Sequence, residues 1–300
     1  MKLLTFIQNG QNRLGIKTDR GVLDAAKIAQ ALSLTDTPLT VHEAIEGGGK
    51  AIASLQRLAD LAPAEPAAGA DYWLDEAELE WGSCVTHPGK IICVGLNYRK
   101  HAEETKAAIP EYPILFNKFG NALTGHNEEV ILPEVSQQVD YEAELVIVMG
   151  KQAKNVSKEQ ALSHVFGYCN ANDLSARDLQ MRTNQWLLGK TCDGFAPLGP
   201  YLVTADEVGN PNDLSIRCTV NGEVRQQSNT SDMIFHCDEI VSYISRHFTL
   251  MPGDIILTGT PEGVVLGYPP EKRVYLQEGD VVSVEIEKLG TLTNRMVAEA

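Results

Sequence analysis

The sequence lacks any motif in which two cysteines lie close enough to share a metal ion. Its six cysteines are scattered over 300 residues and never form a Cys-x-x-Cys pair, which excludes a zinc cluster and a thioredoxin-like redox site. It also lacks a run of lysine and arginine, and an apolar run long enough to span a bilayer. The first residues, MKLLTFIQNGQNR, become polar too early for a signal peptide. We therefore expect a soluble, cytoplasmic protein with reduced cysteines.

Positive charge is scarce in this chain. Twenty-five lysines and arginines face 40 aspartates and glutamates, which gives a formal net charge of −15 and a pI near 4.9. Such a balance argues against nucleic acid as a partner, and a small anionic substrate would need a local group of cations. With 43% hydrophobic and 22% charged residues, the composition is otherwise that of an ordinary globular protein.

The pattern along the chain predicts two units. The first, residues 1–70, begins with short alternating runs and then takes helical spacing in AKIAQALSL and VHEAIEGGGKAIASLQRLADLA, which predicts a small α+β domain. The Ala- and Pro-rich stretch LAPAEPAAGADY indicates an exposed connection, and we assign residues 71–84 to a linker. The second unit covers residues 85–300.

The second unit is rich in predicted strands. Runs such as IICVGLNY, ELVIVMG and VVSVEIEKLG are bounded by turn residues. One amphipathic helix is predicted over residues 231–250, where Ile234, Val241, Ile244 and Phe248 fall on one stripe. Strands outnumber helices and do not alternate strictly with them, so we expect a mixed-sheet α+β fold rather than a doubly wound parallel sheet.

Two glutamates stand one residue apart in VDYEAELVIV, directly before a run of strand-forming residues. Because side chains on a strand repeat every two residues, Glu142 and Glu144 share a face and crowd each other. Two such carboxylates repel unless water, a cation or a shared proton separates them. Oxygen ligands suit hard divalent ions such as Mg²⁺ or Mn²⁺, and a third carboxylate would complete the site.

Asp173, in NANDLSARDLQ, is the candidate for that third carboxylate. It stands where a predicted strand passes into a predicted helix, and an aspartate there is ordinarily a helix N-cap. The segment by itself favours the cap. The need of Glu142 and Glu144 for a counter-ion favours a ligand instead.

Another candidate pair lies in CVGLNYRKHAEE. His101 and Glu104 are three residues apart just beyond a predicted strand, so they lie side by side on a helical turn. A carboxylate that orients an imidazole makes it a good general base. A single His-x-x-Glu pair is, however, more often a solvated surface pair.

Several donors follow the acidic residues. Arg177 and Gln180 share a helix face in ARDLQMR, and Lys190 follows in LLGKTCDGFAPLGP. These side chains can bind a carboxylate or a developing oxyanion, although exposed Arg and Lys usually only solvate a surface. In ILTGTPEGV, a strand runs into a Gly-rich turn where Thr260 and backbone N–H groups can bind an anion. This turn lacks the lysine and the spacing of a phosphate-binding loop.

Taken in order, these segments resemble the fumarylacetoacetate hydrolase family over residues 85 to 297. The segments that carry the resemblance are KIICVGLNYRKHAEE, PILFNKF, VDYEAELVIVMG, FGYCNANDLSARDLQ, GKTCDGFAPLGP, NGEVRQQSNTSDMIF and GDIILTGTPEGV. It implies a catalytic domain built as a mixed β-sheet roll or sandwich, and a homodimer. The N-terminal portion resembles the smaller, variable domain that some members carry.

The resemblance also implies roles for particular residues. It implies that a divalent cation, Mg²⁺ or Mn²⁺, is bound by Glu142, Glu144 and Asp173, and that His101 and Glu104 form a catalytic dyad. It implies further that Lys190 and Gln180 assist catalysis, and that the substrate is also contacted by Lys118, Arg177 and Thr260.

The expected activity is metal-dependent cleavage of a C–C bond beside a carbonyl in a small 2-oxo or 1,3-dicarbonyl acid. Two forms of it are acylpyruvate hydrolysis, which needs a water activated by His101, and oxaloacetate decarboxylation, which does not. One alternative is an isomerase or hydratase of dienoic 2-oxo acids. Another, of a different class, is a non-catalytic metal-binding or interaction protein.

Overall fold

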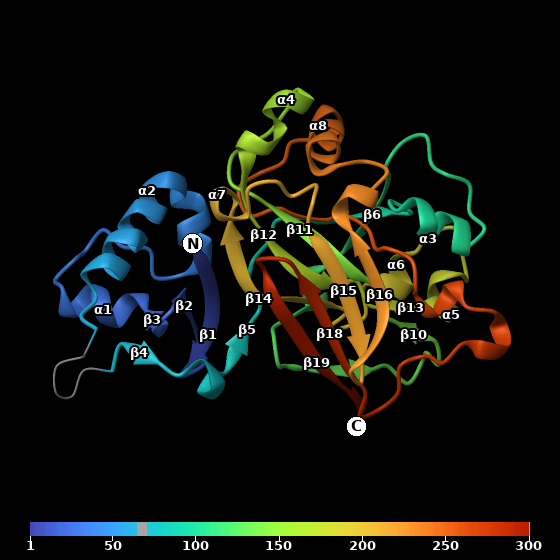
Figure 1. Ribbon diagram of the computed structural model, residues 1–300, viewed down its shortest axis with the longest axis horizontal. Coiled ribbons are helices and arrows are strands. Elements are labelled where there is room, and N and C mark those ends of the chain that lie inside the picture. The colour runs from blue at the N-terminus through green and yellow to red at the C-terminus, as the bar shows by residue number, and fades with distance from the viewer. Residues whose placement is uncertain (65–70, 300) are drawn as a thin grey trace.

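The structure is a computed structural model and describes residues 1–64 and 71–299 (Figure 1). Within these residues, one sheet has twelve strands, a second has five, and a third ladder has two. Helices surround the sheets without alternating regularly with the strands. The expected α+β class is therefore confirmed.

The N-terminal unit is an antiparallel meander covered by two helices. The carboxylate of Asp24 accepts the N–H of Ala26 at 3.0 Å, and Oγ1 of Thr40 accepts the N–H of Glu43 at 3.1 Å. These N-caps explain where the two helices begin. The second helix is kinked at Gly48, whose φ is 53°. The elements are β1 (Lys2–Gln8), β2 (Gln11–Thr18), β3 (Gly21–Asp24), α1 (Ala25–Ala31) and α2 (Val41–Leu61).

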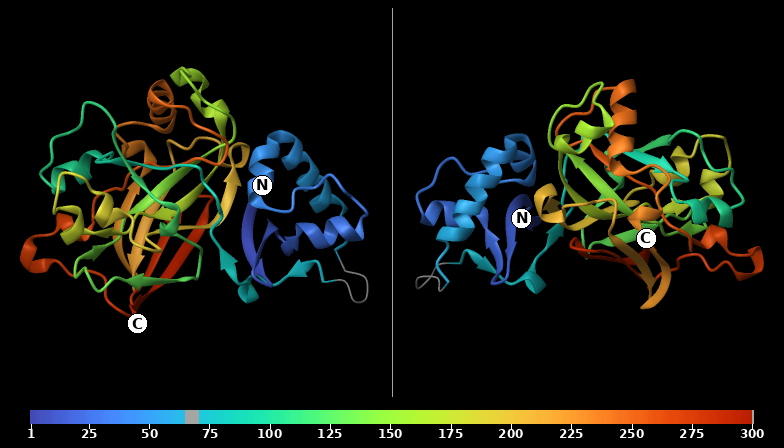
Figure 2. Two further views of the ribbon diagram at one scale, coloured as in Figure 1. Left: turned by 180° about the vertical axis from the view of Figure 1, so that it is seen from behind. Right: turned by 45° about the horizontal axis from the view of Figure 1, so that its top comes forward.

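Main-chain pairing joins this unit to the rest of the chain. β4 (Trp73–Leu74) pairs with β3, β5 (Trp81–Gly82) pairs with β1, and β1 also pairs with β14 (Ala196–Thr204). The N-terminal unit therefore lies at one end of the molecule beside β14 (Figures 1 and 2). Part of the Ala- and Pro-rich stretch, residues 65–70, lies outside the described residues. The division of the chain at residues 71–84 stays a prediction.

The large sheet runs in the order β4-β3-β2-β1-β14-β12-β11-β17-β6-β7. β11, β12 and β14 are buried along their whole length, which explains why their sequences are nearly continuous apolar runs rather than alternating ones. β17 pairs in parallel with β6, whereas β11 and β12 pair antiparallel. The remaining strands of this sheet are β6 (Ile91–Gly95), β7 (Ile114–Lys118), β8 (Leu123–Thr124), β11 (Ala143–Met149), β12 (Val165–Asn172) and β17 (Ile255–Leu257).

The smaller sheet packs against the face of the large one. Leu145 and Ile147 of β11 belong to the same buried cluster as Ile216 and Val284 of the smaller sheet. The two sheets thus form the expected sandwich, with its core between them. The strands of the smaller sheet are, in spatial order, β16 (Glu223–Asn229), β15 (Ser215–Val220), β18 (Val281–Ile286), β19 (Gly290–Ala298) and β9 (Glu129–Leu132).

The helix predicted over residues 231–250 is shorter than expected. α8 covers Cys237–His247, so Ile234 and Phe248 lie outside it. Asn97 holds the preceding segment outside the helix: its carbonyl accepts the N–H of Ile234 at 2.7 Å, and its side-chain oxygen accepts the N–H of Phe235 at 2.8 Å. A tertiary contact therefore sets where this helix begins.

The other short helices lie at the ends of strands. α4 packs against α8 on the outside of the sandwich (Figure 2). In the described part of the chain, no helix combines the length and the apolar character that a bilayer span requires. These helices are α3 (Arg99–Glu104), α4 (Lys158–Ala161), α5 (Arg177–Gln180), α6 (Leu187–Lys190) and α7 (Ala205–Val208).

Candidate active site

Three carboxylates meet at the ends of two neighbouring strands. Glu142 directly precedes β11, Glu144 is within it, and Asp173 directly follows β12. The strands are paired in register at Ala143 and Asn172, and the N–H of Asp173 donates to the carbonyl of Glu142 at 2.8 Å. One carboxylate oxygen from each residue lies within 4.8 Å of the others, and all three side chains are buried. The period of two places both glutamates on the side of Asp173.

Asp173 does not cap a helix. A short strand, β13 (Ser175–Ala176), follows it and pairs with β10 (Val139–Asp140), and α5 begins only after Ala176. The N-cap alternative is therefore wrong. Because the backbone after Asp173 is extended, its carboxylate is free to point toward the two glutamates.

Cationic side chains hold the triad from two sides. Nζ of Lys190 contacts Glu142 and lies 2.9 Å from Oδ2 of Asp173. Nη2 of Arg177 donates to Oε1 of Glu142 at 2.7 Å. Lys118 lies behind Asp173, 2.6 Å from its Oδ1, and is fully buried. Its ammonium also donates to the carbonyls of two loop residues, at 2.6 and 3.0 Å.

The carboxyl groups of the triad differ in their electrostatics. Burial raises the pKa of Glu142, but Lys190 and Arg177 outweigh that effect and hold its pKa well below the usual range. Burial also raises the pKa of Glu144, and the neighbouring charges of Asp173 and Glu142 raise it further. Conversely, the same carboxylates overcome the burial of Lys190 and raise its pKa above the usual range. Glu144 thus needs a cation more than Glu142 does.

The donor set fits a hard divalent cation. Among the described residues, the side chain of Glu144 receives one hydrogen bond, from the N–H of Gly259 at 2.7 Å, and no ion pair. In the same part of the chain, Oδ1 of Asp173 accepts no well-directed hydrogen bond, although Lys118 is close. Three buried carboxylates with unfilled acceptor positions suit Mg²⁺ or Mn²⁺, which take oxygen ligands.

The expected dyad is formed. Nδ1 of His101 lies 2.9 Å from Oε1 of Glu104, and Oε2 of Glu104 accepts the N–H of Gly263 at 2.9 Å. The imidazole therefore has a fixed orientation, and its Nε2 is the nitrogen left for other partners. A Cβ on Gly267 would lie 2.5 Å from the carboxylate of Glu104, so only glycine allows this close approach.

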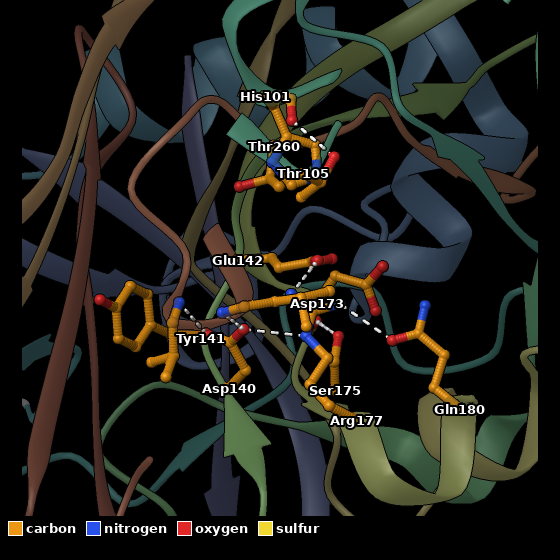
Figure 3. A network of polar contacts seen from close by, with 12 residues as sticks. His101, Thr105, Asp140, Tyr141, Glu142, Asp173, Ser175, Arg177, Gln180 and Thr260 are labelled. Atoms are coloured by element: carbon orange, nitrogen blue, oxygen red, sulfur yellow. Dashed lines mark hydrogen bonds and ion pairs between the residues drawn. The ribbon is translucent and has the colours of Figure 1, made fainter. Parts of the chain in front are cut away.

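A loop after β17 completes the surroundings. Oγ1 of Thr260 accepts a hydrogen bond from Nε2 of Gln226 at 2.8 Å, and the same amide nitrogen donates to the carbonyl of Pro261 at 2.9 Å. These contacts fix the Gly-rich turn that the sequence predicts after the strand. Figure 3 shows Thr260 beside His101 and Thr105, across from Glu142 and the carboxylates around it.

One cavity of about 220 Å³ brings these groups together. Its polar lining comes from both glutamates, the imidazole, and the donors of α5 and α6, while Phe116, Trp186 and Leu266 supply apolar wall. Three predicted residues do not line the cavity. Glu104 contacts His101 and Asp173 contacts Lys190, both of which line it, and Lys118 lies behind Asp173. The predicted residues that do line it are His101, Glu142, Glu144, Arg177, Gln180, Lys190 and Thr260.

Sequence reasoning overlooked one charged residue at this site. Asp140 is fully buried and lies 2.8 Å from Nε of Arg177. The sequence contained a pattern that points to Asp140, because positions 140, 142 and 144 alternate with the same period of two that singled out the glutamates. Trp186 was also overlooked, and an isolated aromatic residue in a loop carries no pattern that predicts a cavity wall.

Comparisons with known proteins show which family the chain resembles. Residues 90–297 match the family model described as "Fumarylacetoacetate (FAA) hydrolase C-terminal". A Dictyostelium discoideum protein, "Fumarylacetoacetate hydrolase domain-containing protein 2 homolog", is 55% identical over 219 residues, covering 70% of this chain and 72% of that protein. "Oxaloacetate tautomerase FAHD2A, mitochondrial" from Bos taurus is 46% identical over 264 residues, covering 87% of this chain and 80% of that protein.

A solved structure is also similar over the whole chain. Maleylpyruvate hydrolase from Sphingobium sp. SYK-6, in complex with manganese(II) and pyruvate, has a TM-score of 0.79 and 28% sequence identity, with 100% of each chain covered. The likeness extends to the N-terminal unit, which the family model does not include.

Proposed function

Because the chain belongs to the fumarylacetoacetate hydrolase family, we propose that it is a divalent-metal-dependent enzyme that moves a proton at the carbon beside the carbonyl of a small 2-oxo acid. The reaction we favour is keto–enol tautomerisation of oxaloacetate. The observation that carries the proposal is that the two glutamates and the imidazole of His101 line one small cavity. The name of the bovine relative supports the choice of substrate.

The cofactor is Mg²⁺ or Mn²⁺, held by Glu142, Glu144 and Asp173. When bound, such an ion polarises the 2-oxo group and stabilises negative charge on its oxygen. Lys118 does not contact substrate in this proposal. It fixes Asp173 from behind, because its ammonium is already engaged by that carboxylate and by two carbonyls.

The remaining donors hold the substrate. Lys190 and Gln180 face the cavity and stabilise the oxyanion of the enolate, and Arg177 binds a carboxylate through the N–H groups that its protein partners leave unused. Thr260 contributes a hydroxyl on the side of His101. The apolar walls exclude water from the carbon that gains the proton.

His101 carries the proton. In the enol-to-keto direction, the enol O–H proton passes to solvent, a C–H bond forms at carbon 3 with a proton from His101, and the imidazole regains a proton from solvent, so the composition of the substrate is unchanged. Protonated at Nε2, His101 donates to carbon 3, and the carboxylate of Glu104 stabilises the imidazolium through Nδ1. The reverse direction uses the same imidazole as the base.

C–C bond cleavage is the second candidate, favoured by the likeness to maleylpyruvate hydrolase. In acylpyruvate hydrolysis, His101 would deprotonate a water that attacks the distal carbonyl. In oxaloacetate decarboxylation no attacking water is needed. Replacing His101 with alanine should therefore reduce hydrolysis much further than decarboxylation, and equal losses would mean that the imidazole does something common to both.

A single assay separates these reactions. Enol oxaloacetate is mixed with the protein and Mg²⁺ or Mn²⁺, and the loss of the enol's ultraviolet absorbance is followed while pyruvate is measured in the same samples. We expect accelerated enol loss without pyruvate, reduced about 10²–10⁴-fold in His101→Ala. Pyruvate formed as fast as the enol disappears would favour decarboxylation. The absence of metal-dependent turnover of oxaloacetate and acylpyruvates would refute both candidates.

Assembly and location complete the proposal. We keep the homodimer as a prediction, to be measured by light scattering during size-exclusion chromatography. We also keep the cytoplasmic location as a prediction, although the name of the bovine relative assigns that protein to mitochondria. Fractionation of cells that express the full-length protein would decide between the two compartments.

A further inference from the structure

Asp140 is a buried carboxylate beside the cavity that does not line it. Its exposed fraction is 0%, and it lies at the end of β10, two residues before Glu142. Oδ2 accepts hydrogen bonds from Nε of Arg177 at 2.8 Å and from the N–H of Leu266 at 3.0 Å, and Oδ1 accepts the N–H of Val265 at 2.8 Å. One carboxylate thus joins a helix residue to a loop far away in the sequence (Figure 3).

The first of these contacts fixes the guanidinium of Arg177. Nη1 of Arg177 donates to Oε1 of Gln180 at 2.9 Å, and Nη2 donates to Glu142. Glu142 is shared with Lys190 and belongs to the metal triad, so it cannot balance the charge of Arg177 by itself. Among the cations of the described residues, Asp140 pairs with Arg177 alone, and it sets the plane of the guanidinium.

The contacts with the loop reach the opposite side of the cavity. Leu266 lines the cavity, and the hydroxyl of Tyr141 donates to the carbonyl of Gly263 at 3.0 Å. The N–H of Gly263 in turn holds the carboxylate of Glu104. Asp140 therefore holds one end of the segment 263–266 and Tyr141 holds the other, where Gly263 binds the dyad.

We propose that Asp140 is a positioning residue that sets Arg177 and the 263–266 loop relative to each other. The proposal rests on the proposed function, because it concerns how the donor and the dyad are aligned on one substrate. Asp140 touches no substrate. Its loss should misalign groups that are already present, so kcat should fall about 10–100-fold while KM changes much less.

The test compares Asp140→Asn with a matched control. Asn keeps the shape of the side chain but removes the charge and one acceptor. Asp178→Asn is the control, because Asp178 neighbours Arg177 in α5 and its carboxylate accepts bonds from Ser136 and Gln137 near the surface instead. We expect the loss of kcat in Asp140→Asn and none in Asp178→Asn. Wild-type kcat in Asp140→Asn would overturn the proposal.

A second measurement does not depend on activity. Amide hydrogen exchange of residues 258–268, recorded in EDTA, should be faster in Asp140→Asn than in wild type, because the N–H groups of Val265 and Leu266 bind different carboxylate oxygens and asparagine keeps only one of them. Tyr141→Phe should also accelerate exchange in this segment without touching Arg177, which keeps the test valid if Asp140→Asn folds poorly. Unchanged exchange in both variants would overturn the link to the loop, even if the wild type turned over no oxo acid and the proposed function failed.

A double-mutant cycle tests the link to Arg177. Asp140→Asn, Arg177→Lys and the double variant are compared by kcat. If Asp140 acts through the guanidinium, the double variant should lose less than the product of the single losses. Losses that multiply would show that the two residues act independently and would overturn the proposal.

Discussion

Replacing Glu144 with glutamine should weaken metal binding and stabilise the metal-free protein. Glutamine keeps an oxygen to accept the N–H of Gly259 but removes a carboxyl group that, without metal, must either repel two other carboxylates or take up a proton. The ligand atoms of the triad lie within 4.8 Å of one another, and at that limit two unit charges repel by about 3 kcal/mol at an effective dielectric constant of about 20; Lys190 offsets part of this repulsion. We therefore expect the free energy of unfolding in EDTA to rise by on the order of 1 kcal/mol.

In the presence of metal, the wild type should be more stable than Glu144→Gln. An ion that binds only the folded state at a hundred times its dissociation constant stabilises the wild type by about 2.7 kcal/mol. Glu144→Gln removes one of three carboxylate ligands, so most of this increment should disappear, together with metal-dependent turnover.

Urea unfolding in EDTA and in excess Mg²⁺ or Mn²⁺ measures both effects. Glu128→Gln is the matched control, since Glu128 also accepts a glycine N–H, that of Gly125 at 2.7 Å, but lies outside the triad. The control should keep the wild-type increment. If Glu144→Gln kept it as well, or stayed fully active in EDTA, the assignment of the triad as a metal site would be refuted.

Three further predictions concern the surroundings of the triad and a distant histidine. Lys190→Met should lower kcat/KM about 10²–10³-fold if the ammonium stabilises charge that develops in the transition state, and a rise in KM alone would mean that it only anchors the substrate. Gly267→Ala should lower activity by displacing Glu104, whereas Gly120→Ala, where a Cβ meets nothing within 4 Å, should not; equal activities would contradict the close approach. Burial lowers the pKa of His126 to about 4, and its Nδ1 accepts a backbone N–H. As the pH falls from 6.5 to 4, this histidine therefore binds protons in the unfolded chain before it does so in the folded protein. The free energy of unfolding should fall by about 3 kcal/mol over this range, and urea unfolding should show a smaller fall in His126→Gln.

Local sequence chemistry predicted the elements that lie near the active site with fair accuracy. The strand after Glu142, the helical turn of His101 and Glu104, and the Gly-rich turn after β17 all follow from short-range patterns. The helix over residues 231–250 did not, because Asn97 is more than 130 positions away and decides where it begins. A single side chain that bonds to a distant backbone leaves no periodic signal.

The pairing of two glutamates likewise predicted that a cation or a proton is needed, but not which residue completes the site. The segment around Asp173 by itself favoured a cap, and the need of the glutamates for a counter-ion favoured a ligand; the extended backbone at Ser175 excludes the cap. Lys118 and Lys190 were both predicted to surround substrate. The structure places Lys190 at the cavity, in contact with two carboxylates, and Lys118 behind Asp173, where two backbone carbonyls accept from its ammonium.

The sequence by itself determined the fold class, because local patterns predict which segments are strands and which are helices. It also determined the repulsion between Glu142 and Glu144 and the pairing of His101 with Glu104, because the members of each pair are only two or three positions apart. The tertiary structure alone decided the contacts of Asp140 and Gly263. Asp140 acts through Arg177 and through a loop more than 120 residues away, and Gly263 acts through a backbone N–H that any residue type carries. Hydrogen bonds between distant segments depend on how the two sheets pack, and packing is a property of the whole chain rather than of any short stretch.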